Sequence, residues 1–164
     1  MSYWESRKHL QYYRYIESLL ASKSGDSIID VGGHDTPMVL SGQFKKRVVL
    51  SLWPLDVDKR FPSVEYRIED FMSASVEKFD FVMCLQTLEH IVDVEAFTSK
   101  LFEISTGKVL ISVPYQWPKG LEREHVQDPV TMEKVESWTG LKPTISHVVD
   151  SESRFPRLVC YYDN

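Results

Sequence analysis

The sequence predicts an α/β fold, in which a mostly parallel sheet of about seven strands carries helices on both faces and ends in an antiparallel pair of strands. Apolar runs of strand length alternate with segments of helical periodicity, the pattern of parallel strands joined by helices. Residues 79–85 are almost continuously apolar, as in a central strand that is buried on both faces. The expected strands cover residues 27–31, 48–52, 64–68, 79–85, 109–113, 145–149 and 157–162.

Capping residues place the helices between these strands. Asp93 and Thr131 favour helix N-termini. The helix that begins after Asp93 is expected to end at Gly107, and the helix that begins after Thr131 is expected to end at Gly140. The expected helices cover residues 4–22, 36–43, 94–105 and 132–139.

We expect one domain over residues 1–164, made of an N-terminal helical segment, 1–24, and a sheet core, 27–164. The N-terminal helix has apolar side chains at three- and four-residue steps, so we expect it to pack on the sheet and to end at residues 25–26. The alternative is a lid over a ligand site, with His9 or a tyrosine in contact with the ligand.

Composition and charge limit the function classes. The net charge of −5 and the isoelectric point near 5.5 argue against a dedicated nucleic-acid-binding protein, which would carry a basic face. The first residues contain no apolar signal-peptide core, and no apolar run approaches the ~20 residues that cross a membrane. Cys84 and Cys160 lie in apolar segments, which favours buried thiols over a disulfide and predicts a cytoplasmic protein.

The segment 27–37 carries the first candidate site residues. Asp30 lies at the end of a short apolar strand, Gly32 and Gly33 form a turn, and Thr36 is a suitable N-cap for a following helix. This geometry brings a ligand against bare backbone and a helix N-terminus, beyond the carboxyl ends of the strands. Further polar residues are expected at that edge of the sheet, namely Ser51, Asp70, residues 86–90 and the loop after Val113.

Four stretches carry a resemblance to a known family. They are Ile28-Ile-Asp-Val-Gly-Gly33, Ile68-Glu-Asp70-Phe71, Phe79-Asp-Phe-Val-Met-Cys-Leu-Gln-Thr-Leu-Glu-His90 and Lys108-Val-Leu-Ile-Ser-Val-Pro114. In type and order they resemble the Rossmann-like (class I) S-adenosylmethionine-dependent methyltransferases, over residues 27–162. The Phe-Asp strand followed by Leu-Glu-His is the most specific of them.

The resemblance implies S-adenosylmethionine as the cofactor. The glycine turn would lie against its methionine end, because a Cβ there would hold the ligand off the backbone. Asp70 would accept a hydrogen bond from the adenine amino group, and the Phe71 backbone would meet the edge of the ring. Leu85 and Gln86 would close the pocket beneath the adenosine and the sulfonium. The implied cofactor-binding positions are Asp30, Gly32, Gly33, Ser51, Asp70, Phe71, Leu85 and Gln86.

The sequence departs from the family pattern at two places. His34 and Thr36 stand where the family carries the second and third glycines of its turn, and Ser51 stands where an acid would hold the ribose hydroxyls. Asp56 and Asp58 reach that place only if their loop folds back. These departures motivate an alternative, a non-catalytic methyltransferase-like binding or scaffold module with a degenerate cofactor site.

The resemblance implies an enzyme that transfers a methyl group, and His90 is the candidate base, assisted by Glu89 and His125. Histidine changes charge near neutral pH, which suits the removal of a proton from an attacking hydroxyl. We therefore expect O-methylation of a small molecule or a sugar, in a pocket with an aromatic wall that includes Tyr115 and Trp117. The other interpretation is structural, with Glu89-His90 capping the next helix or contacting the loop after the fifth strand.

The same residues admit a metal site, which we favour less. Small-RNA 2′-O-methyltransferases and ubiquinone-pathway O-methyltransferases carry Glu-x-x-Glu-His with a later histidine and bind a divalent ion. This chain has Gln86 in place of the first glutamate, so Glu89, His90 and His125 would hold the ion.

Overall fold

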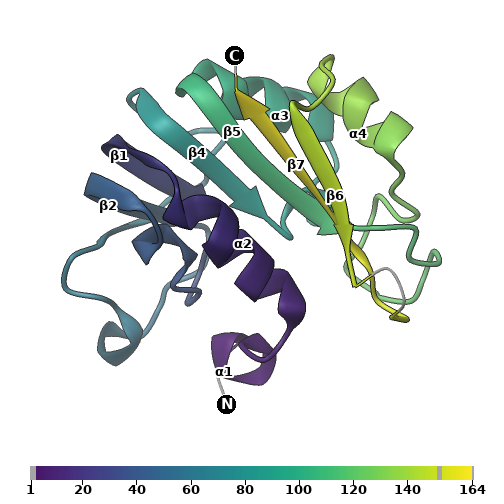
Figure 1. The fold of residues 1–164 in the computed structure, drawn as a ribbon, viewed down its shortest axis with the longest axis horizontal. Coiled ribbons are helices and arrows are strands. Elements are labelled where there is room, and N and C mark those ends of the chain that lie inside the picture. Colours follow the sequence, from purple (N-terminus) through teal and green to yellow (C-terminus); the bar gives the residue numbers. More distant parts are fainter. Residues whose placement is uncertain (1–2, 151–152, 164) are drawn as a thin grey trace.

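A computed structural model describes residues 3–150 and 153–163. Its centre is a seven-stranded sheet with the strand order β3-β2-β1-β4-β5-β7-β6 (Figure 1). Strands β1 to β5 run parallel to one another, whereas β7 runs antiparallel to both β5 and β6. The predicted fold class is therefore confirmed. The strands are β1 (Ser24–Val31), β2 (Gln43–Ser51), β3 (Glu65–Ile68), β4 (Phe79–Leu85), β5 (Ser105–Pro114), β6 (Ile145–Val149) and β7 (Arg157–Asp163).

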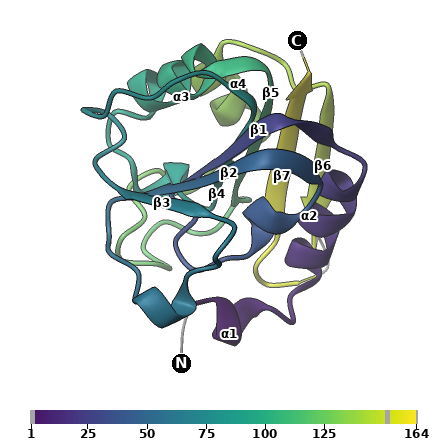
Figure 2. The same ribbon diagram turned by 90° about the vertical axis from the view of Figure 1, so that its left-hand side faces the viewer.

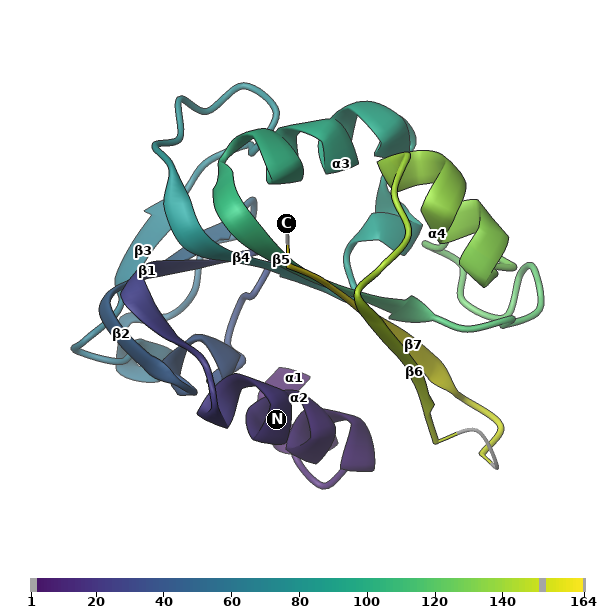
Figure 3. The ribbon, with the colours of Figure 1, turned by 45° about the horizontal axis from the view of Figure 1, so that its top comes forward.

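Helices cover both faces of the sheet, whose β3 edge faces the viewer in Figure 2. Figure 3 shows α1 (Tyr3–Arg7) and α2 (Gln11–Ala21) on one face, and α3 (Val94–Glu103) and α4 (Met132–Thr139) on the other. Successive side chains of a strand point to opposite faces, so each face has its own core. The core under α2 includes Tyr12, Ile28, Val49 and Phe81, and the core under α3 and α4 includes Ile29, Val82, Leu101 and Val135.

The predicted caps set the ends of α3 and α4. The Asp93 carboxylate accepts a hydrogen bond from the Ala96 amide at 3.3 Å, and the Thr131 hydroxyl accepts one from the amide three residues later. Gly140 adopts the left-handed conformation (φ 67°) that ends α4. Gly107 does not end α3, because it lies inside β5, which begins sooner than the sequence predicts.

The N-terminal segment forms two helices rather than the single predicted helix over 4–22. The break falls before Leu10, whose backbone is extended, and α1 folds back so that Trp4 meets Tyr13 edge-on with ring centroids 4.9 Å apart. Packing of α2 on the sheet through its apolar face is as predicted, since its buried residues are in the core. Residues 25–26 do not end the helical segment but belong to β1.

No α-helix follows the glycine turn, contrary to the expectation for residues 36–43. The connection between β1 and β2 covers only residues 32–42, which leaves room for a single 3-10 turn, η1 (Met38–Leu40). The Thr36 hydroxyl donates to the Gly33 carbonyl at 2.8 Å and closes the turn instead of capping a helix. The predicted helix N-terminus is therefore absent from the ligand edge.

The two cysteines agree with the expectation of buried thiols. Cys84 and Cys160 are free and buried. Among the described residues, no helix combines the length and the apolar character that crossing a membrane requires.

Candidate active site

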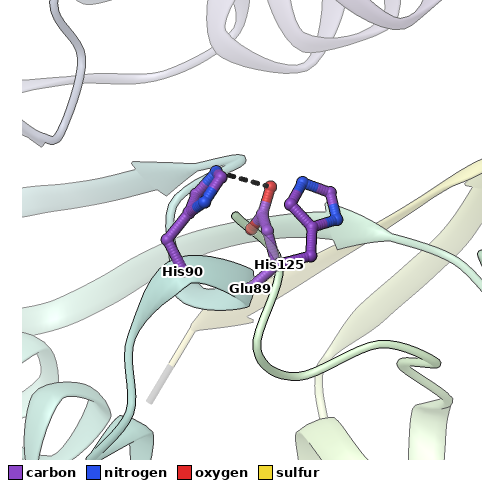
Figure 4. Close-up of side chains that lie close together, drawn as sticks. All are labelled: Glu89, His90 and His125. Carbon is purple, nitrogen blue, oxygen red and sulfur yellow. Dashed lines mark ion pairs between the residues drawn. The ribbon is translucent and has the colours of Figure 1, made fainter. Parts of the chain in front are cut away.

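Three predicted catalytic side chains meet beyond the carboxyl end of β4. Glu89 and His90 lie on η3 (Leu88–His90), a 3-10 turn that directly follows β4, and His125 comes from the loop after β5. Their ligand-type atoms all lie within 4.8 Å of one another. Figure 4 shows the Glu89 carboxylate between the two histidine rings, whose centroids are 4.8 Å apart. Residues that are distant in the sequence therefore form one cluster, which we call the Glu-His-His cluster.

Backbone hydrogen bonds hold the loop of His125 against η3. The amides of Val126 and Gln127 both donate to the Glu89 carbonyl, at 2.9 and 3.2 Å. The Gln127 side-chain amide donates to the Ile91 carbonyl at 2.7 Å. These contacts fix the position of His125 independently of any ligand.

Both histidines have one ring nitrogen engaged. His90 Nδ1 lies 3.1 Å from the Glu124 carbonyl, which can only accept, so this nitrogen carries the proton. His125 Nδ1 lies 2.7 Å from the Asp128 carboxylate, a buried group that orients the ring in the same way. The Nε2 atoms are left as the free acceptors, a tautomer suited either to take a proton or to bind a cation.

Burial gives Glu89 an unusual charge state. The residue is 2% exposed, and one carboxylate oxygen, Oε2, has no hydrogen-bond partner among the described residues. Its other oxygen lies 3.9 Å from His90 Nε2. Desolvation by burial raises the pKa of the Glu89 carboxyl to about 8, so the group is protonated at neutral pH unless a positive charge lies beside it.

The glycine turn packs directly against the start of η3. Gly32 has φ 86°, and a Cβ on it would lie 2.4 Å from the Thr87 hydroxyl oxygen. A Cβ on Gly33 would lie 2.4 Å from a carboxylate oxygen of Asp30. The close approach of the Thr87 and Asp30 side chains therefore requires glycine at these two positions. The sequence alone gives no sign of this packing requirement.

Asp30 lies beneath this turn rather than at its surface. The side chain is fully buried, and neither carboxylate oxygen has a hydrogen-bond partner among the described residues. Burial raises the pKa of Asp30 from 3.8 to about 7.

The residues after β3 occupy the expected edge of the sheet. Asp70 is exposed, and its carboxylate accepts hydrogen bonds from the Met72 amide at 3.1 Å and the Ser73 hydroxyl at 3.3 Å. The Phe71 ring is buried, and its carbonyl accepts from Lys100 Nζ at 2.6 Å. Beside these residues, apolar side chains remain exposed: Leu52 by 59%, Ile68 by 40% and Met72 by 42%.

β2 ends in Ser51, where the family pattern has an acid. Ser51 is buried, and its hydroxyl accepts a hydrogen bond from the Trp53 amide at 3.3 Å. Asp56, a candidate substitute, is instead paired with Lys59 at 2.7 Å on the surface. The departure seen in the sequence therefore persists in the fold.

A hydrogen-bonded chain connects the end of β4 to α2. Leu85 is the last residue of β4, and Gln86 follows it with φ 50°. The Gln86 side-chain amide donates to the Ser112 hydroxyl at 3.2 Å, and that hydroxyl lies 2.5 Å from the hydroxyl of Tyr12. Gln86 is thus tied to β5 and to α2.

Solved structures resemble this arrangement over most of its length. Neither a scan of protein-family models nor a search of curated proteins gives a match. The N-methyltransferase NodS from Bradyrhizobium japonicum WM9, in complex with S-adenosyl-L-homocysteine, has a TM-score of 0.76 at 14% identity, over 94% of this chain and 86% of that chain. Magnesium protoporphyrin IX methyltransferase (ChlM) from Synechocystis PCC 6803, with bound S-adenosylmethionine, has a TM-score of 0.72 at 13% identity. The match covers 100% of this chain and 85% of that chain.

A third structure, the small RNA methyltransferase HEN1, has a TM-score of 0.74 at 13% identity and covers 94% of this chain and 25% of that chain. These likenesses decide the fold. The chain has the class I methyltransferase fold. Magnesium protoporphyrin IX and small RNA are named for two of these proteins, so the fold by itself leaves the acceptor open.

Three side chains near the site were not predicted from the sequence, namely Asp128, Asp35 and Arg157. Asp128, three residues after His125, holds that histidine ring from within the same loop. Asp35 is buried and accepts from the Trp4 amide at 3.1 Å, which ties α1 to the glycine turn. Arg157 begins β7 and lies opposite Pro114 at the end of β5, because the two strands are antiparallel. No local pattern marks Asp35 or Arg157.

Proposed function

We propose that this protein is an enzyme that transfers a methyl group from S-adenosylmethionine to an oxygen atom of a small molecule or a sugar. The observation that carries the proposal is the position of the Glu-His-His cluster. It lies at the carboxyl end of β4, and Thr87, two residues before Glu89, is in contact range of the glycine turn. In a class I methyltransferase fold this is the edge of the sheet where ligands bind.

Several features support a cofactor site at this edge. Exposed Leu52 and Ile68 offer apolar surface to an adenosyl group, and the Asp70 carboxylate retains acceptor capacity beyond its two hydrogen bonds. A positive charge at the glycine turn would favour the ionised form of Asp30, whose carboxyl is otherwise protonated below about pH 7. Leu85 and Gln86 line the end of β4, between the glycine turn and the cluster.

The residues of the cluster have separate roles in the proposed reaction. S-adenosylmethionine supplies an electrophilic methyl group, so the protein has to align the acceptor and remove its proton. His90 is the proposed base, because its side chain is 39% exposed and its Nε2 is free. His125, whose side chain is 7% exposed, is held by Asp128 and is proposed to orient the acceptor hydroxyl. Glu89, which lies 3.9 Å from His90 Nε2, shifts toward its ionised form as positive charge develops on His90, and the carboxylate then stabilises that charge.

A small acceptor fits the charge of the chain. The net charge of −5 supplies no general attraction for the phosphates of a nucleic acid. The loop after β5 contacts the cluster, and α1 is tied to the glycine turn through the Trp4 amide and Asp35; both would shape the acceptor pocket.

Calorimetry with S-adenosylmethionine and S-adenosylhomocysteine tests the proposal. We expect both to bind, and Asp70→Ala to weaken binding by about tenfold, the loss of one charge-assisted hydrogen bond. Asp26, which is exposed at the start of β1 and so lies at the opposite end of the sheet, provides the matched control: Asp26→Ala should bind as the wild type does. If neither compound binds at millimolar concentration, the protein is better described as a scaffold or binding module with a degenerate cofactor site.

A divalent cation is a second candidate at the cluster, and a specific observation favours it. Each histidine donates its Nδ1 proton to an acceptor, which is the usual support of a metal-bound imidazole, and Glu89 Oε2 is buried without a partner. Glu89, His90 and His125 would hold the ion. When bound, a cation lowers the pKa of an oxygen that it touches.

Cobalt titration distinguishes the two interpretations of the cluster. If the cation is correct, Co²⁺ gives a ligand-field absorption spectrum that His125→Ala abolishes and that the exposed His147→Ala preserves. Binding must displace the Glu89 proton, so affinity should rise with pH up to about 8, the pKa of this carboxyl. Equal Co²⁺ absorption in wild type and His125→Ala, or none in either, would exclude the cation.

A further inference from the structure

A cavity of about 410 Å³ lies beside the Glu-His-His cluster. Its walls come from three separate segments: the junction of α1 and α2, the loop after β5, and the β6–β7 connection with the start of β7. Its size is that of a small-molecule site. Trp117 connects the cavity to the Glu-His-His cluster, since it lines the cavity and its ring stacks on His125 with centroids 5.7 Å apart. Trp117 is therefore the side chain through which the cavity adjoins the cluster.

Arg157 is the only arginine or lysine among the described residues that line the cavity. Its guanidinium packs over the rings of Tyr12 and Trp117, 5.3 and 5.5 Å from their centroids, which holds the group in place. It donates one hydrogen bond, to the Phe155 carbonyl at 3.1 Å. Among the described residues it forms no ion pair within 4.0 Å. A guanidinium has five N–H donors, so most of its donors are available to a ligand.

The rest of the wall combines apolar side chains, including Leu10, Trp117 and Phe155, with polar side chains, and two of the polar side chains carry the opposite charge. Glu122, which is exposed, and Asp150, which is half-buried, both line the cavity, and neither reaches ion-pair distance of Arg157. Gln11 adds an amide, and Phe155 adds a partly exposed ring. Carboxylates accept hydrogen bonds from hydroxyl groups but repel a second negative charge. The cavity thus presents one site for an oxyanion and a separate region for hydroxyl groups.

We propose that this cavity binds the methyl acceptor, and that the acceptor is a small hydroxylated molecule with a single oxyanionic group held by Arg157. The role of this molecule as the methyl acceptor rests on the proposed methyl transfer, whereas the binding specificity rests on the cavity alone. Carboxylate and phosphate share the geometry that a guanidinium recognises, so either is a suitable anionic group. Glu122 and Asp150 select against a molecule that is anionic at both ends.

A matched series of small molecules tests the specificity. Glucose, gluconate and glucarate have similar size and carry no, one and two carboxylates, and glucose 6-phosphate replaces the carboxylate with phosphate. Binding is measured for each by saturation-transfer NMR. We expect gluconate or glucose 6-phosphate to bind about tenfold more tightly than glucose and glucarate. Which of the two binds better identifies carboxylate or phosphate as the natural group.

Variants locate the specificity at named residues. Arg157→Gln should bring the affinity for the single-anion ligand down to that for glucose, Arg157→Lys should retain part of the preference, and Glu122→Gln should improve glucarate. Equal affinity for glucose and gluconate in the wild type, or an unchanged preference in Arg157→Gln, overturns the proposal. If Arg157→Gln does not fold, the wild-type series decides alone.

The two proposals fail in different ways. S-adenosylhomocysteine binding is measured on the same samples and should be unchanged in Arg157→Gln. Anion preference without cofactor binding would leave the cavity assignment intact and remove methyl transfer. Cofactor binding without anion preference would leave methyl transfer intact and remove the cavity assignment.

Discussion

His90→Ala is expected to lower the methyl-transfer rate by about 10²- to 10⁴-fold, the usual contribution of a general base. His90 Nδ1 is hydrogen-bonded to the Glu124 carbonyl. Nε2 lies 3.9 Å from Glu89, beyond hydrogen-bond distance, and is therefore the nitrogen available to an acceptor hydroxyl. The affinity for S-adenosylhomocysteine should not change, because the ring acts on the acceptor. The measurement is turnover of methyl-labelled S-adenosylmethionine at saturating acceptor, beside calorimetry on the same variant.

A histidine outside the site provides the control for this loss. His147 lies on β6, where its ring stacks on Tyr15 of α2 with centroids 5.0 Å apart. His147→Ala should therefore turn over as the wild type does. Undiminished turnover in His90→Ala would remove the assignment of the base and leave His125, with its Asp128 partner, to be tested in its place.

Asp30→Asn is expected to flatten the pH dependence of stability. The folded protein keeps the Asp30 carboxyl protonated up to about pH 7, whereas an ordinary aspartate in the unfolded chain ionises near 3.8. Between these values unfolding releases a proton, so the free energy of unfolding falls as pH rises, and it falls no further above about pH 7. A difference of about three pKa units corresponds to about 4 kcal/mol as an upper limit. Asparagine does not titrate and removes this slope.

Urea unfolding at a series of pH values between 4 and 8 measures the effect. The exposed Asp58→Asn is the matched control and should keep the wild-type slope. Glu89→Gln should remove a further part of the slope, between 4.5 and about 8, because the pKa of that carboxyl is also raised by burial. A wild-type slope in Asp30→Asn would mean that water or an ion reaches the carboxylate in solution.

Long apolar strands and well-capped helices were predictable from local sequence. Residues 79–85, 132–139 and 145–149 have the expected bounds, because apolar runs and residues such as Thr131 and Gly140 act within a few positions. The break before Leu10 was not predictable, since it depends on Trp4 folding back onto Tyr13. The missing helix after β1 follows from the short connection to β2, and a locally good cap at Thr36 cannot overcome that limit.

The site was predictable where residues directly follow strands. Glu89 and His90 come immediately after β4, so the topology of a parallel sheet fixes their place. Asp128 orients His125 and Arg157 occupies the adjoining cavity, and both reach the site through tertiary contacts of loops and an antiparallel strand. A pattern of residue types carries no direct signal for such contacts.

The central claim is that an adenosyl cofactor binds at the glycine turn, next to the Glu-His-His cluster. Amide chemical-shift mapping with S-adenosylhomocysteine tests it most directly. We predict that the shifts concentrate at Gly32, Gly33, Asp70 and Gln86, with no change at Ile145 on the distant edge strand β6. Shifts confined to other surfaces, or none at millimolar ligand, would contradict the account.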